Sequence, residues 1–170
     1  MKSEERTMDM LLQRVLKHVP DPSRGLPDAV FNFAVKITPM INVDLLVRND
    51  RSEHLLAWRE DDWGSGWHIP GGIIRYNEPI HERIAAVARS ELSTGVRHSS
   101  LPVDIKQFFH RRGHFISLLF LCELEAPIGD RSLLQLDIPR TGALRWIQGA
   151  PSDLYSVHKV YSDWLNGRFV

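Results

Sequence analysis

The segment from Trp67 to Val96 constrains the fold of this chain most, because it joins a tight glycine turn to a helix rich in carboxylates. Pro70, Gly71 and Gly72 form the turn, and a short strand leads from it into the helix. Glycines let the backbone approach a ligand closely, and a bare carbonyl oxygen there can bind a hard cation. A helix carboxylate facing that carbonyl can hold Mg²⁺ against a diphosphate, where the metal stabilises the charge that develops on a phosphate leaving group. The segment therefore predicts a loop–helix unit that can hold a magnesium ion.

Helical and strand patterns alternate along the chain, which is typical of an α/β or α+β domain rather than a helix bundle. We expect the strands at residues 41–47 and 55–59 to form a hairpin. Residues 60–66 are expected to form a loop. The expected helices cover residues 3–18, 28–36, 77–93 and 154–165, and the expected strands cover residues 41–47, 55–59, 71–74, 105–110, 115–123 and 144–147.

The first expected helix carries an apolar stripe and ends before Pro20. Such a helix either lies on the domain as an extra element or serves as an arm that forms a dimer. We expect residues 1–25 to be a helical extension with a linker, and residues 26–170 to be one domain. The stripe consists of Met8, Leu11, Leu12, Val15 and Leu16.

The composition excludes several classes of protein. Twenty-one Lys and Arg balance twenty-one Asp and Glu, so no basic excess is available to neutralise a nucleic-acid backbone. Cys122 is the sole cysteine, which rules out an internal disulfide and a cysteine-rich zinc site. The apolar stretch 116–122 is far shorter than the roughly 20 residues of a spanning helix. Glu4 and Glu5 stand where a secretory signal would be apolar. We expect a soluble, cytoplasmic protein that binds neither nucleic acid nor a membrane.

The glycine-and-glutamate spacing of the segment 67–96 resembles the Nudix box, Gx5Ex7REUxEExGU, in which U is aliphatic. Gly72 matches the first glycine, Glu78 the first glutamate and Glu91 the last glutamate. Residues 38–72 are similar to the N-terminal half of the GDP-mannose mannosyl hydrolase subgroup of that superfamily. The resemblance implies the α/β Nudix fold, a mixed β-sheet sandwiched between α-helices, here with an extra N-terminal helix.

The same resemblance implies a function. Members of the subgroup use Mg²⁺, with Mn²⁺ as a possible substitute, to hydrolyse a nucleoside diphosphate sugar to the sugar and a nucleoside diphosphate, and they are homodimers. It implies that the Gly71 carbonyl and Glu91 bind the metal and that Asp44 and Arg59 contact the substrate. His110 is the candidate acid or base by its location. Trp63 is a candidate for stacking on a base or sugar, and Arg111, beside Arg112, is a candidate phosphate contact.

Several working positions depart from the family pattern. Val87 and Ser90 stand in place of two box glutamates, which the subgroup also lacks. Ala86 and Ile73 stand where the subgroup has arginines, and the positions of its glutamine metal ligand and histidine base map to Arg140 and Thr141. An aliphatic side chain cannot bind a diphosphate, and threonine cannot accept a proton near pH 7.

These departures leave three functions open. The chain is a hydrolase of nucleoside diphosphate sugars, or a weak or inactive domain that binds a nucleotide or sugar nucleotide. Pyrophosphate cleavage of a nucleoside triphosphate is the third reading, which Val87 and Ser90 disfavour. Glu78 and Glu82 are expected to pair with Arg89 and hold the box together, rather than to bind metal. We expect His158 and Cys122 to be structural.

Overall fold

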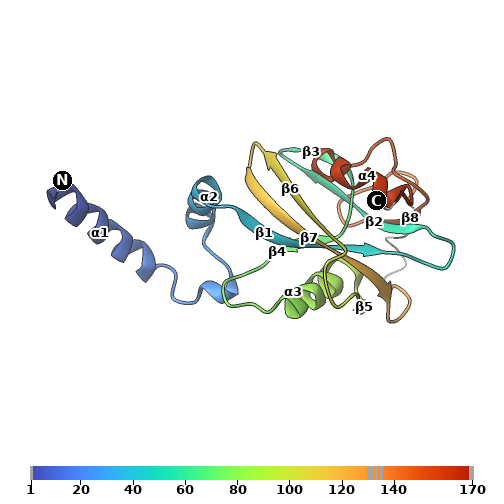
Figure 1. Cartoon of the computed structure of the whole chain (residues 1–170), viewed down its shortest axis with the longest axis horizontal. Helices are drawn as coiled ribbons and strands as arrows, with labels where there is room; N and C mark the ends of the chain where they lie inside the picture. The colour runs from blue at the N-terminus through green and yellow to red at the C-terminus, as the bar shows by residue number, and fades with distance from the viewer. Residues whose placement is uncertain (1, 130–131, 133, 135, 169–170) are drawn as a thin grey trace.

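The structure of the chain is a computed structural model that describes residues 2–129, 132, 134 and 136–168. Its N-terminal helix α1 (Lys2–Lys17) is followed by a short 3₁₀ turn (Pro22–Arg24) and by helix α2 (Asp28–Ile37), close to the expected bounds. Asp21 caps the 3₁₀ turn by accepting a hydrogen bond from the Ser23 amide. Figure 1 shows α1 extending away from the rest of the molecule, so it does not lie on the domain.

The described strands form two sheets. In the larger sheet the order is β4 (Gly71–Ile73), β1 (Met40–Val47), β7 (Gly113–Leu124) and β5 (Val96–His98), and β6 (Asp104–His110) also pairs with β7. Strands β1 and β7 are parallel and the other pairs are antiparallel, so the sheet is mixed. The smaller sheet is antiparallel, in the order β3 (Gly64–His68), β2 (His54–Asp61) and β8 (Leu144–Ile147).

The expected hairpin between the first two strands is wrong. β1 and β2 belong to different sheets and are joined by a single bridge between Arg48 and His54. Both edges of β1 are already taken by β4 and β7, and its residues 42–47 are buried. Alternation along a strand shows which face each side chain is on but not which strands pair with it, so the order of the two strands along the chain misidentified the partner of β1.

The expected loop over residues 60–66 is also wrong, because β2 continues to Asp61 and β3 starts at Gly64. Gly66 explains the misreading. Its φ is +156°, and a β-carbon there would lie 2.5 Å from the carbonyl oxygen of Asp153. The glycine that suggested a loop instead allows β3 to pass against the C-terminal segment, where the Trp67 amide donates to the Asp153 carbonyl.

The two faces of the larger sheet are covered differently. Helix α3 (Ile80–Val87), continued by a π-helical turn (Ala88–Leu92), packs on one face against side chains that include Val43 and Leu45. The smaller sheet and the C-terminal segment cover part of the other face, where Leu46 and Leu119 pack against Trp67 and Tyr161. Alternation along β1 therefore sends apolar side chains toward α3 and leaves Asn42 and Asp44 on the opposite face.

The C-terminal segment is only partly as expected. In place of one helix over 154–165, a 3₁₀ helix (Ser156–Tyr161) precedes the short α4 (Ser162–Leu165). No helix in the described part of the chain is long and apolar enough to cross a membrane.

Candidate functional site

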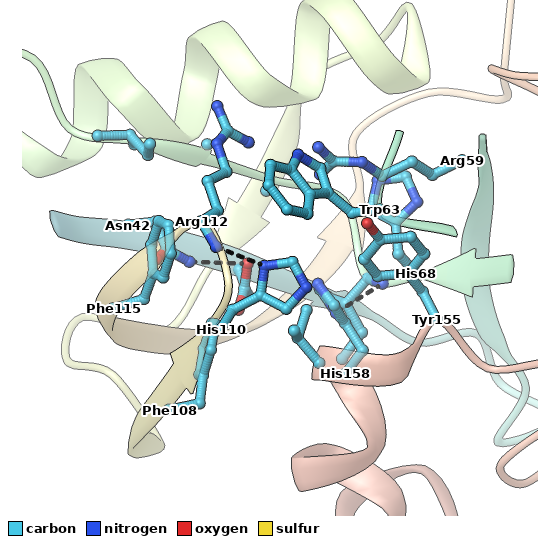
Figure 2. Close-up of a pocket in the computed structure, with 16 residues that line it drawn as sticks. Asn42, Arg59, Trp63, His68, Phe108, His110, Arg112, Phe115, Tyr155 and His158 are labelled. Carbon is cyan, nitrogen blue, oxygen red and sulfur yellow. Dashed lines mark hydrogen bonds between the residues drawn. The ribbon is translucent and has the colours of Figure 1, made fainter. Parts of the chain in front are cut away.

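A pocket of about 110 Å³ opens at the junction of the two sheets and the C-terminal segment (Figure 2). It contains five of the predicted site residues, namely Asp44, Arg59, Trp63, Gly71 and His110. The remaining lining residues come from β1, from β3 and β4, from the β6–β7 hairpin and from the C-terminal segment: Asn42, His68, Ile69, Gly72, Ile73, Phe108, Arg112, Phe115, Tyr155, Val157 and His158.

Glu91 lies beside this pocket on the π-helical turn that ends α3. Its Oε1 accepts a hydrogen bond from the Gly71 amide over 3.2 Å, so the helix carboxylate and the glycine turn meet as predicted. The contact uses the N–H of Gly71 rather than its carbonyl. Ser93 ends the turn at φ +55°, in the left-handed conformation with which helices commonly end, usually at a glycine. Π-helical turns within helices are common at functional sites.

His68 is a candidate site residue that the sequence reasoning missed. It lies on β3 with its side chain 11% exposed, and its Nε2 is 3.2 Å from Oε2 of Glu91. Its Nδ1 is buried and has no hydrogen-bond partner among the described residues. Strand alternation was the available signal, because Trp67 and Ile69 face the core and residue 68 must face the other way.

His158 packs beside His68, with ring centroids 5.7 Å apart. Its Nδ1 accepts a hydrogen bond from the Ile69 amide over 3.2 Å. Burial lowers the pKa of His158 well below the ordinary value of 6.5, with a smaller contribution from the charge of His68. His158 is therefore neutral near pH 7 and holds the chain just before the Pro70 turn, which supports the structural role expected for it.

Asp44 forms the floor of the pocket and is only 2% exposed. Ser117 and Tyr161 donate hydrogen bonds to its Oδ2, and Asn42 donates to its Oδ1 over 3.2 Å. Burial raises the pKa of Asp44 to about 6, and these hydrogen bonds limit the rise. Asp44, which the resemblance predicted to contact the substrate, is thus buried and already accepts hydrogen bonds from three side chains.

Tyr155 and Asp61 hold Arg59 at the pocket, which Trp63 also lines. The Arg59 guanidinium lies 5.3 Å from the ring centre of Tyr155, and its Nε is 2.6 Å from Asp61. The Tyr155 hydroxyl donates to the same aspartate over 2.9 Å. Trp63, at the tip of the β2–β3 hairpin, meets His110 edge to face, with ring centroids 5.4 Å apart.

The β6–β7 hairpin places Arg112 in the pocket, whereas Arg111 lines a neighbouring hollow with Asp62, Trp63 and His110. Arg112 rather than Arg111 therefore lines this pocket, and the expected phosphate contact of Arg111 stays a prediction. The Arg112 guanidinium lies 5.2 Å from the ring centre of Phe31 on α2. The Arg112 amide donates to Nδ1 of His110 over 3.3 Å. A backbone N–H can only donate, so the neutral His110 ring carries its proton on Nε2 and acts there as a donor.

Glu78 has a structural role, but its partner is Arg83 and not the expected Arg89. Arg83 donates from Nε and Nη2 to the two carboxylate oxygens, each over 2.8 Å, and the Arg75 amide donates to the same carboxylate. A fork-shaped pair of this kind holds the strand after the glycine turn against the start of α3. Arg140 and Thr141 are not among the residues that line the pocket.

The described residues supply too few metal ligands to hold a divalent cation alone, so a bound substrate must complete its coordination. Among the described residues, no three His, Cys, Asp or Glu side chains come together as a ready-made metal site. Glu91 nevertheless keeps 26% of its side chain exposed beside a pocket lined by Arg59 and Arg112. Mg²⁺ is commonly held by one or two carboxylates together with substrate phosphates. The residues therefore fit a cation that binds jointly with a diphosphate.

Comparison with solved structures identifies the fold. The chain superposes on the MutT protein of Methanosarcina mazei with a TM-score of 0.59 and 18% identity, over 77% of this chain and 96% of that protein. A MutT Nudix hydrolase of Burkholderia pseudomallei gives a TM-score of 0.58 and 15% identity, over 78% and 99% of the two chains. The chain has the Nudix fold. This likeness confirms the predicted fold class.

Comparisons of sequence match a smaller part of the chain than the comparisons of structure do. No family model matches the chain. The low-salt glycan biosynthesis protein Agl8 of Haloferax volcanii is 30% identical over 89 residues, which is 52% of this chain and 56% of that protein. The match thus spans little more than half the length of this curated relative.

Proposed function

We propose that this Nudix-fold protein is a divalent-cation-dependent hydrolase of a nucleoside diphosphate sugar. The observation that carries the proposal is the position of Glu91, whose carboxylate meets the Gly71 turn at the edge of a pocket that contains two arginines. A glycan biosynthesis protein among the relatives supports a sugar nucleotide, since glycans are built from such donors.

Each part of the ligand has suitable partners in the pocket. Arg59 and Arg112 bind the diphosphate, because guanidinium groups match phosphate oxygens in charge and shape. Trp63 and Tyr155 offer aromatic faces to the base or the sugar. His110 donates from Nε2 to an oxygen of the leaving diphosphate, which makes it an acid or hydrogen-bond donor rather than a base.

The reaction needs little covalent chemistry from the protein. A water oxygen bonds to the anomeric carbon, the bond from that carbon to the diphosphate oxygen breaks, and the diphosphate leaves with the electron pair while the water proton passes to solvent. Glu91 and the Gly71 turn would hold Mg²⁺ or Mn²⁺, which supplies charge stabilisation to the leaving diphosphate. Asp44 orients the ligand from the pocket floor.

The test is turnover of a panel of nucleoside diphosphate sugars by the full chain with Mg²⁺ or Mn²⁺, with products followed by ³¹P NMR and by assay of free sugar. We expect a nucleoside diphosphate and a free sugar, and we expect Glu91→Gln to abolish turnover. Glu82→Gln is the matched control, because Glu82 is an exposed glutamate of α3 outside the pocket. A nucleoside monophosphate among the products would instead identify pyrophosphate cleavage.

A second candidate is a domain that binds a sugar nucleotide without hydrolysing it. It is favoured by the fact that both oxygens of Glu91 already have partners, the Gly71 amide and His68. In that case calorimetry would detect binding of a sugar nucleotide, and no product would form with any sugar nucleotide of the panel.

A further inference from the structure

The contact between His68 and Glu91 has the spacing of two ligands of one metal ion. Their Nε2 and Oε2 atoms are 3.2 Å apart. Two neighbouring ligands of an octahedral ion, each about 2.1 Å from it, lie about 3.0 Å apart, and two ligands of a tetrahedral ion lie about 3.4 Å apart. An ion can therefore bind both atoms with little movement of either side chain.

The fold fixes both members of this pair from different elements. His68 is held on β3, where Trp67 and Ile69 on either side of it are buried in the core. Glu91 is held on the π-helical turn by the hydrogen bond from the Gly71 amide to Oε1, which leaves Oε2 facing His68. Such preorganised pairs lose little side-chain entropy when they bind a ligand.

The place of His68 leaves such an ion within reach of a ligand. His68 lines the pocket together with Arg59 and Arg112, and its side chain is 11% exposed. An ion held by its Nε2 and by Oε2 of Glu91 would therefore lie at the edge of the pocket that is proposed to hold the diphosphate.

We propose that His68 is a metal ligand together with Glu91, and that it makes this site prefer Mn²⁺ or a similar transition-metal ion to Mg²⁺. The inference rests on the cation site of the proposed function and specifies its metal. Imidazole nitrogen suits transition ions, whereas Mg²⁺ prefers oxygen ligands and gives up its water reluctantly. Val87 and Ser90 supply no carboxylate to this turn, so the nitrogen of His68 has a larger share in the choice of metal.

The direct test is isothermal titration calorimetry of MnCl₂ and of MgCl₂ into the full chain with a saturating nucleoside diphosphate, corrected by titrations of the nucleotide alone. We expect Mn²⁺ to bind the wild-type protein at least about tenfold more tightly than Mg²⁺. His68→Phe keeps a planar ring and should weaken Mn²⁺ binding by about tenfold or more while changing Mg²⁺ binding little. His68→Glu introduces an oxygen ligand and should shift the preference toward Mg²⁺. His54→Phe is the control, because His54 is also buried but lies outside the pocket.

A second measurement needs no variant in this strand. Substoichiometric Mn²⁺ should broaden the imidazole NMR signals of His68 more strongly than those of His54. If Glu91→Gln abolishes metal binding but His68→Phe leaves the Mn²⁺ affinity and the ion preference unchanged, the role of His68 is wrong and the cation site of the proposed function stands. If the wild-type protein binds neither ion in the presence of the nucleoside diphosphate, both the cation site and the role of His68 are wrong.

Discussion

The carboxylate of Asp44 occupies the space that a β-carbon at Gly71 would need. Such a β-carbon would also lie 2.8 Å from the Val43 carbonyl oxygen, which belongs to the backbone of β1 and cannot rotate away. The glycine of the turn and the buried aspartate are therefore one unit, in which the absence of a side chain on one strand makes room for a carboxyl group on the next.

We accordingly expect Gly71→Ala to reduce the free energy of unfolding by about 1–3 kcal/mol, as overpacking does in well-packed interiors. It should also weaken ligand binding, because Asp44 must move and the Gly71 amide supports Glu91. Chemical denaturation and calorimetry measure the two effects. Gly129→Ala is the control, since its β-carbon would meet nothing closer than 3.6 Å. Equal stability of the two variants would contradict this prediction.

The pKa of Asp44 makes stability depend on pH in an unusual direction. Burial raises this pKa from 3.8 to about 6, so the folded state holds the proton more tightly than the unfolded chain does. The stabilisation is fully present below about pH 4 and is lost as the pH rises through about 6. The difference corresponds to about 3 kcal/mol.

Asp44→Asn should remove this component. Its stability relative to wild type should therefore improve by about 3 kcal/mol between about pH 4 and pH 7, measured by urea denaturation at each pH. Asp50→Asn, at an exposed aspartate between β1 and β2, should show no such trend. A wild-type protein that gains stability over Asp44→Asn as the pH rises would reverse the sign and refute the assignment.

Substitution of Glu78 should reduce stability without changing metal affinity. Glu78→Gln removes the charge that Arg83 binds through two hydrogen bonds, and we expect a loss of about 1.5–3 kcal/mol in the free energy of unfolding. A double-mutant cycle with Arg83→Met should recover most of that loss as coupling energy. Metal affinity should stay at the wild-type value. A variant with unchanged stability and lost metal affinity would instead place Glu78 in the cation site.

The exposed stripe of α1 predicts that the chain forms a homodimer through this helix. Each of its apolar side chains is at least 40% exposed in the single chain. Light scattering should give twice the monomer mass for the full chain and the monomer mass after removal of residues 1–25. Leu12→Gln should weaken the dimer, whereas Met10→Gln should not, because helical spacing places Met10 on the opposite side of α1 from the stripe. A monomeric full chain would refute the prediction.

Local chemistry made the element types and the glycine–glutamate unit predictable. Apolar periodicity gave α1 and α2, and the spacing from Gly72 to Glu91 gave the turn, the strand and α3. The same information failed for residues 64–66, which were expected in a loop but pair with residues 59–61 in the β2–β3 hairpin. It also failed for the partners of β2, which are β3 and β8 rather than β1. His68 was overlooked for a related reason, because its importance comes from Glu91, which lies 23 residues further along the chain.

The sequence by itself determined the Nudix-type frame, since periodicity, glycine turns and a fixed spacing are properties of short segments. Only the tertiary structure decided which side chains share the pocket. It places His68 beside Glu91 and pairs Glu78 with Arg83. It also places Arg112, rather than Arg111, in the pocket. The physical reason is that these contacts depend on strand register and on the packing of two sheets, which are set by long-range burial rather than by local propensity.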